Sequence, residues 1–189
     1  MILDRREDPV TPLLNQWTYQ GMIHELIGLK NNRVDLKHLP HLSDEMKEVV
    51  LSCEDDEFFR QIMFNNFGDV ADSIHSLVQS FLQKKKSQAQ FNTIEDMQRI
   101  IENFPEFKKG ERNTSKHFNI LEEMRKIVDQ RNLYDSSETE QDIVSGVESK
   151  NKHFKAIEAL ITKDDTHKLE ALRLVLLFAL RYEKDDKVR

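Results

Sequence analysis

Apolar side chains recur every three or four residues along most of the chain, which is the spacing of helices with one buried face. The most regular run has steps of four and three residues and consists of Met63, Phe67, Val70, Ile74, Leu77 and Phe81. Such a heptad seam predicts one long helix from about Asp56 to about Lys84.

A second run of the same kind follows a short polar stretch. Residues 84–92, "KKKSQAQFN", lack a period and predict a flexible connection. Thr93 with Asp96 resembles a capping arrangement and opens a helix that Pro105 disturbs near its end at Phe104. We therefore expect a mainly α fold, a multi-helix bundle with a projecting antiparallel helical hairpin.

The segment before the hairpin is less regular. Thr11 followed by Pro12 predicts the start of a helix, which Gly28 closes. Residues 31–40 read as a connection with little regular structure. Ser43 then predicts the cap of a short helix, whose apolar side is formed by Met46, Val49, Val50 and Leu51.

The segment after the hairpin also reads as helical. One helix begins at Ser115, and Ser137 with Glu140 forms a capping box for a short helix that ends near Gly146. Two final helices are predicted at Lys152–Ile161 and at about Asp165–Tyr182. The last is apolar over most of its circumference, so we expect it to lie deep in a core.

A lone strand is predicted at the N-terminus, because Ile2 and Leu3 resemble the stub of a buried strand. An isolated strand leaves its backbone groups without partners, so its neighbours must be supplied elsewhere or be missing. The charged run that follows is interpreted as an ion-pair network that fixes a corner between strand and helix. The residues of this structural corner are Asp4, Arg5, Asp8, Pro9, Pro12 and Trp17.

Composition limits the classes of function. The net charge is −6 and the basic residues are scattered apart from residues 84–86, which disfavours nonspecific binding of nucleic acid. One cysteine fits a reducing compartment. The longest apolar run, 171–180, contains Arg173 and is too short to cross a bilayer. With no signal peptide evident, we predict a soluble, cytosolic protein.

Candidate chemistry is sparse, and we predict no catalytic residue, no metal and no cofactor. His38 and His41 flank Pro40, but no further ligand completes a zinc site. Cys53 precedes an acidic cluster that disfavours a thiolate nucleophile. The glycosylation pattern at residues 113–115 is discounted because nothing indicates secretion.

Several segments resemble the Sec/Munc (SM) family of SNARE-binding vesicle-fusion regulators. These are "ILDRREDPVTPLLNQWTYQGMIHELIG", "LSCEDDEFF", "NTIEDMQRIIENFPEFKK", "SKHFNILEEM", "QRNLYDSSETEQDIV" and "EALRLVLLFALRYE". They cover essentially the whole chain in one order, and the first is similar to the branch that serves trans-Golgi and endosomal traffic.

The resemblance implies that the chain is a piece of a much longer protein, with Met1 an added start. Residues 1–8 correspond to the strand remnant of a preceding α/β domain, 9–183 to helical domain 3a, and 184–189 to a tail. The chain is then expected to act at Golgi and endosomal membranes, which it reaches only through its SNARE partners.

In that family the hairpin of domain 3a lines a cleft that grips a syntaxin-family SNARE helix, and its tip offers a surface for a vesicle SNARE. Here the hairpin corresponds to Asp56–Lys84 and Thr93–Phe104, with the tip at Lys85–Asn92. The implied apolar contacts are Ile94, Met97, Ile100 and Ile101. Family members often have a proline near the hairpin hinge, and none lies between Met63 and Phe104 here.

Three alternatives stay open at the level of sequence. Lys84, Lys85 and Lys86 either pair with acidic residues of SNAREs or are a solvated helix end with lysines at its negative pole. The seam from Met63 to Phe81 either packs within this chain or meets a second copy in an oligomerisation module. An enzyme that uses the charged cluster at 4–8 is the weakest hypothesis, because the chain lacks a nucleophile, a metal site and a cofactor loop.

Overall fold

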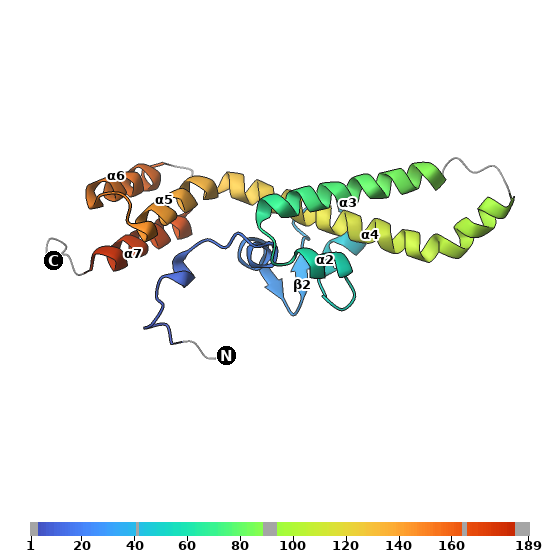
Figure 1. Cartoon of the computed structure of the whole chain (residues 1–189), viewed down its shortest axis with the longest axis horizontal. Coiled ribbons are helices and arrows are strands. Elements are labelled where there is room, and N and C mark those ends of the chain that lie inside the picture. Colours follow the sequence, from blue (N-terminus) through green and yellow to red (C-terminus); the bar gives the residue numbers. More distant parts are fainter. Residues whose placement is uncertain (1–3, 41, 89–93, 164–165, 184–189) are drawn as a thin grey trace. The chain divides into compact units, whose positions relative to one another are not determined.

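The computed structural model describes residues 4–40, 42–88, 94–163 and 166–183, together with their side chains except those of 85–108. The chain folds as two compact units. One unit comprises Gln16–Arg125, and the other comprises Met1–Asn15 and Lys126–Arg189. Figure 1 traces the order of the elements along the chain. The predicted domain boundaries remain a prediction.

The helix predicted from Thr11 to Gly28 is interrupted. A single 3-10 turn, η1 (Thr11–Leu13), is followed by extended backbone, and helix resumes as α1 (Tyr19–Met22) and a π-helical turn, η2 (Ile23–Gly28). The interruption has a cause in the tertiary structure, because Phe67 N–H donates to the Trp17 carbonyl and Tyr19 N–H to that of Asn65. Gly28 closes the helix as predicted, with φ of +103°.

The same pairing breaks the helix predicted over 56–84. Two helices replace it, α2 (Glu57–Ile62) and α3 (Phe67–Gln88), and an isolated bridge between Thr18 and Asn66 lies at the break. The heptad seam therefore predicted α3 correctly but missed the extended turn before it. The polar residues 84–88 continue α3, contrary to the predicted connection, while 89–93 lie outside the described residues.

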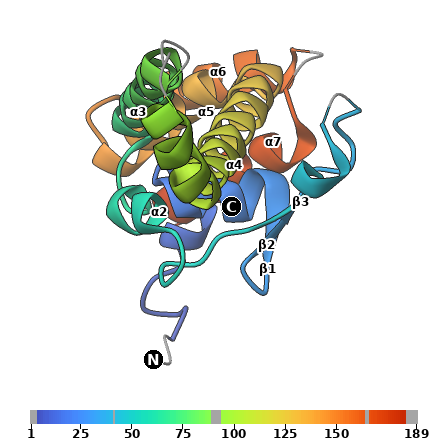
Figure 2. The same ribbon diagram turned by 90° about the vertical axis from the view of Figure 1, so that its right-hand side faces the viewer.

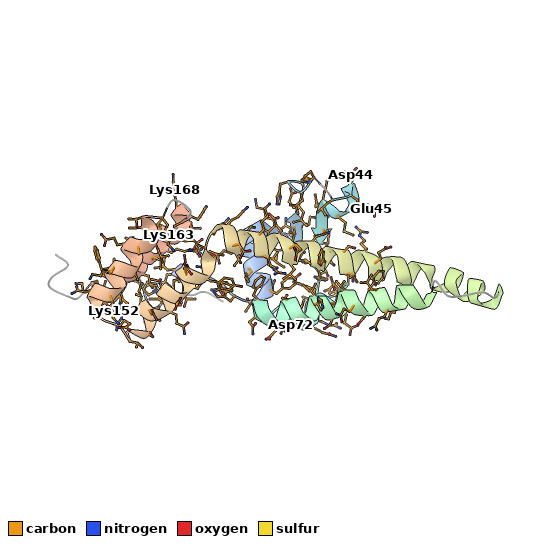
Figure 3. All side chains as sticks on the ribbon, turned by 90° about the horizontal axis from the view of Figure 1, so that it is seen from above. Asp44, Glu45, Asp72, Lys152, Lys163 and Lys168 are labelled. Carbon is orange, nitrogen blue, oxygen red and sulfur yellow. The ribbon has the colours of Figure 1, made fainter. Side chains whose placement is uncertain are left out.

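The second helix of the hairpin is longer than predicted. Helix α4 (Ile94–Gln130) runs without a break through Pro105 and Ser115, although the sequence predicts the end of one helix and the start of another there. A proline removes one backbone hydrogen bond, and a helix of this length tolerates that loss. Figures 1 and 3 show α3 and α4 side by side and running in opposite directions, as the hairpin prediction requires.

A small antiparallel sheet replaces two other predictions. Strands β1 (Leu29–Lys30), β2 (Arg33–Asp35) and β3 (Glu48–Val50) lie in the order β1-β2-β3. Residues 31–40 are therefore not irregular throughout. The helix expected after Ser43 is a short 3-10 turn, η3 (Asp44–Met46), and the two valines behind it belong to β3. Val49 is buried and Val50 is exposed, which is the alternation of a strand.

The core of the first unit lies between its helices and the sheet. Fully buried side chains come from α1, β2, α2, α3 and α4, among them Tyr19, Met22, Val34, Phe59, Ile74, Ile120 and Met124. Figure 2 shows α2 on one side of α4 and the strands on the other. The mainly α fold predicted from the sequence is confirmed, although the described residues also include this sheet.

The second unit contains α5 (Leu133–Ser145), α6 (Lys150–Ile161) and α7 (Lys168–Tyr182), which pack against one another. Their core consists of Ile143, Ile157, Leu160, Leu174 and Leu177. Helix α5 begins at Leu133, ahead of the predicted capping box, and ends at Gly146 as expected. The ends predicted for the last two helices, at 161 and 182, are correct.

Helix α7 is not deeply buried, contrary to the prediction from its apolar circumference. Leu174 and Leu177 face the core, whereas Leu172 is 54% exposed, as are large parts of Leu169, Val175 and Leu176. Within its own unit α7 packs against α5, α6 and η1, which cover one side of the helix. Among the described residues no helix is long and apolar enough to cross a membrane.

Candidate functional site

The hairpin is held at its base by a buried polar network centred on Asp56. This residue precedes α2, and its Oδ1 accepts a hydrogen bond of 3.0 Å from the Phe59 amide, which makes it the N-cap of the helix. Its Oδ2 lies 2.9 Å from His117 Nε2 and also binds the Lys116 ammonium group. The Asp56 carboxylate thus joins two helices: Oδ1 binds the first turn of α2, and Oδ2 binds two side chains of α4.

Tyr19 extends the network to α1. Its hydroxyl lies 2.9 Å from His117 Nδ1, and the rings of Phe58 and Phe59 lie against the imidazole, with ring centroids 5.0 and 6.4 Å away. The Asp56 carboxylate can only accept, so the neutral imidazole of His117 carries its proton on Nε2 and donates it to Asp56. Nδ1 of His117 then accepts a hydrogen bond from the Tyr19 hydroxyl. Both ring nitrogens of His117 therefore have a hydrogen-bond partner.

The electrostatics follow from burial and pairing. Burial alone would raise the pKa of Asp56, but hydrogen bonds from His117, Lys116 and the Phe59 amide outweigh it and hold that pKa far below its usual value. Burial lowers the pKa of His117, despite the neighbouring carboxylate, and burial raises the pKa of Tyr19. At neutral pH Asp56 is therefore an ionised carboxylate that forms an ion pair with Lys116, beside a neutral imidazole and a neutral phenol.

A tyrosine, a histidine and an aspartate in line resemble a proton relay, yet this set is closed to a substrate. His117 has no exposed surface and Asp56 only 2%. The arrangement is suited to fixing α1, α2 and α4 together rather than to chemistry. Sequence reasoning missed it because 61 residues separate its two central members and no local motif joins them.

A second polar network lies in the other unit. Glu140 is buried and accepts bonds of 3.1 and 2.8 Å from the backbone amide and side-chain amide of Asn15. Arg173 donates to Asn15 Oδ1 at 2.9 Å and to Glu170 at 3.4 Å. Glu140, predicted to cap α5, instead fixes the N-terminal segment against the helices.

The outer half of the hairpin carries the predicted partner-binding residues. Lys84 is exposed on α3, and the nearby Leu82 is 49% exposed. Lys85 and Lys86 belong to α3, while Ile94, Met97, Ile100 and Ile101 belong to the first turns of α4. The side chains of these six lie outside the described residues, so their proposed contacts remain predictions. The described part of the seam, with Phe67, Val70 and Ile74 buried, packs inside the unit.

A family model described as the Sec1 family matches residues 1–188. The chain belongs to the Sec1 family. The resemblance noted in the sequence is thus confirmed. The chain is 47% identical, over its whole length, to vacuolar protein sorting-associated protein 45 homolog of Arabidopsis thaliana, and 43% identical over 97% of its length to vacuolar protein sorting-associated protein 45 of Homo sapiens. It spans 33% and 32%, about a third, of these two relatives.

Solved structures agree with this assignment. The chain matches a structure described as SM protein Vps45 in complex with the Qa SNARE Tlg2 with a TM-score of 0.91 and 41% identity. The match covers 98% of this Sec1-family chain and 33% of the other. A structure of Vps45 without a partner in its description matches with a TM-score of 0.82.

The predicted corner of this Sec1-family chain is a set of exposed ion pairs and one cap. Arg6 pairs with Asp4 at 2.7 Å and Arg5 with Asp8 at 3.4 Å, and Asp8 Oδ1 accepts from the Thr11 amide at 3.0 Å. Pro9 and Pro12 are exposed beside this cap. The strand predicted at Ile2 and Leu3 lies outside the described residues.

Trp17 belongs to the other unit, where its ring lies 6.3 Å from that of Phe67 between centroids. The two candidate metal ligands are not brought together in the described structure: His38 bonds to Glu123 at 2.9 Å, and His41 lies outside the described residues. Among those residues no cluster could hold a metal ion. Cys53 lies 3.3 Å from the sulfur of Met63.

Proposed function

We propose that this chain supplies the SNARE-gripping helical hairpin of an SM protein that regulates vesicle docking and membrane fusion in Golgi and endosomal transport. The observation that carries the proposal is the match over 98% of the chain to a Vps45 structure described as a complex with a Qa SNARE. The proposed partners are a syntaxin-family SNARE and a vesicle SNARE, recognised as helices without any chemical step.

The proposed place of action follows from the same relatives. Both curated relatives quoted above are named for vacuolar protein sorting. We place the chain in the cytoplasm, associated with Golgi and endosomal membranes through its SNARE partners.

The architecture of the first unit supports a role in helix recognition. The Asp56 network fixes the start of α2 against α4 at the base of the hairpin. The proposed contact surface for a third helix is the antiparallel pair of α3 and α4, and a surface that is ordered before binding loses less entropy. Lys84, exposed on α3, adds a positive charge to that surface for an acidic partner.

The test uses the paired substitutions Met97→Asp and Ile101→Asp in a full-length Sec1-family protein that carries this segment. We expect retention of a vesicle SNARE in a pull-down to fall by at least about tenfold, because a charge in an apolar helix contact is desolvated without a partner. Circular dichroism checks that helicity is kept. Ile161→Asp, on an exposed apolar residue of α6, is the matched control.

Unchanged retention by the double variant would show that the hairpin assignment is wrong. The alternative of an oligomerisation module through the Met63–Phe81 seam has less support, because Phe67, Val70 and Ile74 are already buried within the chain. Light scattering separates the two hypotheses, since a stable dimer at micromolar concentration favours self-association.

A further inference from the structure

A cavity of about 380 Å³ lies between β3 and α4, and its described lining includes none of the predicted SNARE-binding residues. Its walls are formed by Glu48, Val49, Val50 and Ser52 on one side and by Lys109, Arg112, Asn113 and Lys116 on the other, with Arg33, Asp55 and Asp56 between them. Figure 2 shows β3 on the strand side of α4. All of these residues belong to the first unit.

The charges of the cavity do not cancel. Arg33 pairs with Glu48 at 2.6 Å, and Lys116 pairs with Asp56 inside the buried network. Lys109 and Arg112 lie one turn apart on α4, and both are exposed. Neither has a carboxylate partner among the described residues, and Asp55 is the one described lining carboxylate left to oppose them. Among the described lining residues, four basic side chains therefore face three acidic ones, an excess of positive charge in a chain whose net charge is −6.

The opposite wall includes the outer edge of β3, the last strand of the sheet. Leu36 N–H donates to Lys47 O and Leu51 N–H to Asn32 O, so residues 47, 49 and 51 turn their backbone groups toward β2. The backbone N–H and C=O groups of the intervening residues, Glu48 and Val50, point away from β2. The Val50 carbonyl confirms this direction, because it accepts from Lys116 Nζ at 3.4 Å.

We propose that this cavity binds an extended peptide segment that pairs with the outer edge of β3 and places an acidic side chain on Lys109 and Arg112. Strand addition uses the outward amides of Glu48 and Val50, because the Val50 carbonyl already accepts from Lys116, and every second side chain of the added strand projects to the same face. Val50, 47% exposed, offers apolar contact to a neighbouring residue of the peptide.

A peptide carboxylate fits the cavity better than a phosphate group. A phosphate carries close to two negative charges and three acceptor oxygens, whereas the wall offers two cations with Asp55 nearby. A single carboxylate balances the charge that remains when Asp55 is set against Lys109 and Arg112. The peptide backbone then supplies hydrogen-bond partners for the outer edge of β3. This peptide site is independent of the proposed SNARE binding, and the experiment below tests it separately.

The experiment is a titration of the ¹⁵N-labelled 189-residue chain with a short peptide of alternating valine and glutamate, blocked at both ends. We expect saturable shifts of the Glu48 and Val50 amide signals. The same peptide with lysine in place of glutamate is expected not to bind. A glutamate peptide that is N-methylated on its backbone is expected to bind at least about tenfold more weakly, because it cannot pair as a strand.

Matched variants test the charged wall. Lys109→Glu with Arg112→Glu is expected to weaken binding of the glutamate peptide by about tenfold or more. Lys155→Glu with Lys168→Glu, which reverses two exposed charges in the other unit, is expected to leave it unchanged. Circular dichroism confirms that both double variants fold.

The proposal is overturned by equal binding of the lysine peptide, by equal binding of the N-methylated peptide, or by the absence of shifts at Glu48 and Val50. Titration with inorganic phosphate is the remaining comparison. If phosphate displaces the glutamate peptide and reproduces its spectral changes, the cavity is a small-anion site and the peptide proposal is wrong.

Discussion

His117 Nε2 lies 2.9 Å from Asp56 Oδ2, although 61 residues separate the two in the chain. The contact joins the residue that caps α2 to the middle of α4, and the second ring nitrogen of His117 continues it to Tyr19. Every side chain of this set is nearly or fully buried. The packing of α1, α2 and α4 against one another therefore includes a few polar atoms that water does not reach.

Asp56→Asn should be strongly destabilising. The change leaves the Lys116 ammonium group buried without a counter-charge, which costs about 3–5 kcal/mol of unfolding free energy. Asp55→Asn, on the adjacent exposed residue, should stay within about 0.5 kcal/mol of the parent. Urea denaturation followed by circular dichroism measures both.

A double variant separates the charge from the cap. Asp56→Asn combined with Lys116→Met removes both charges while asparagine keeps an N-cap acceptor, so it should be less destabilised than the single variant. If the double variant loses more stability than Asp56→Asn alone, the buried charge is not the source of the effect.

Stability should fall with pH in two stages. The pKa of His117 is lowered in the folded state from its ordinary value of 6.5, so below about pH 6.5 the unfolded chain binds a proton that the folded chain excludes. The free energy of unfolding therefore decreases as pH falls through this range. The pKa of Asp56 is lowered from 3.8, which adds a second decrease below about pH 4.

His117→Gln should remove the first stage and leave the second. The polar groups that act on His117 are the Tyr19 hydroxyl, Lys116 and Asp56. The pKa of Tyr19 is raised and that of Asp56 is lowered, which moves both titrations away from the range between about pH 5.5 and pH 7.5. His24→Gln, which removes an exposed histidine, is the control. A first stage that persists in His117→Gln would assign the pH dependence to another group.

Helical periodicity predicted most of the fold because it records local burial. The seam residues Phe67, Val70 and Ile74 are buried as expected, and the end of α5 at Gly146 was read from a single glycine. The predictions that were wrong concern elements whose shape depends on contacts with residues far away in the sequence. The break before Phe67 arises because residues 17–19 pair with residues 65–67, and nothing in either segment alone signals that pairing.

The sheet was missed for a different reason. Each strand has two or three residues, so the alternation at Val34 and at Val49 is too short to outweigh a helical reading. The polar networks were also invisible, because Asp56 and Glu140 both look like ordinary capping residues in sequence. Asp56 does cap α2 through Oδ1, but its Oδ2 also binds His117, which lies 61 residues further along the chain.

Two glycines should respond to alanine in opposite directions. Gly110 lies inside α4, and apart from the backbone of its own helix no described atom lies within 4 Å of an added Cβ, so Gly110→Ala should stabilise the chain by about 0.5–1 kcal/mol. Gly146 has φ of +65°, and an added Cβ meets the Arg181 guanidinium. Gly146→Ala should therefore destabilise by about 1–2 kcal/mol or more. Thermal unfolding compares the pair directly.

The hydrogen bonds of Glu140 should contribute to the stability of the second unit, as those of Asp56 do in the first. Glu140→Gln leaves the two Asn15 donors with one acceptor oxygen and should cost about 1–3 kcal/mol. Glu138→Gln, exposed on the same helix, should cost less than about 0.5 kcal/mol. Hydrogen exchange should show faster exchange of the Asn15 amide in the first variant, and equal exchange in both would contradict the assignment.

The two faces of α7 offer the clearest contrast between similar residues. Leu174 has no exposed surface and belongs to the core of its unit, so Leu174→Ala should cost about 2–5 kcal/mol. Leu172, two positions earlier, is 54% exposed, and Leu172→Ala should change the unfolding free energy by less than about 0.5 kcal/mol. Since both variants remove the same atoms from the same helix, propensity cancels and burial alone sets the difference. Equal losses in denaturant titrations of the 189-residue chain would mean that the apolar face of α7 is covered in solution.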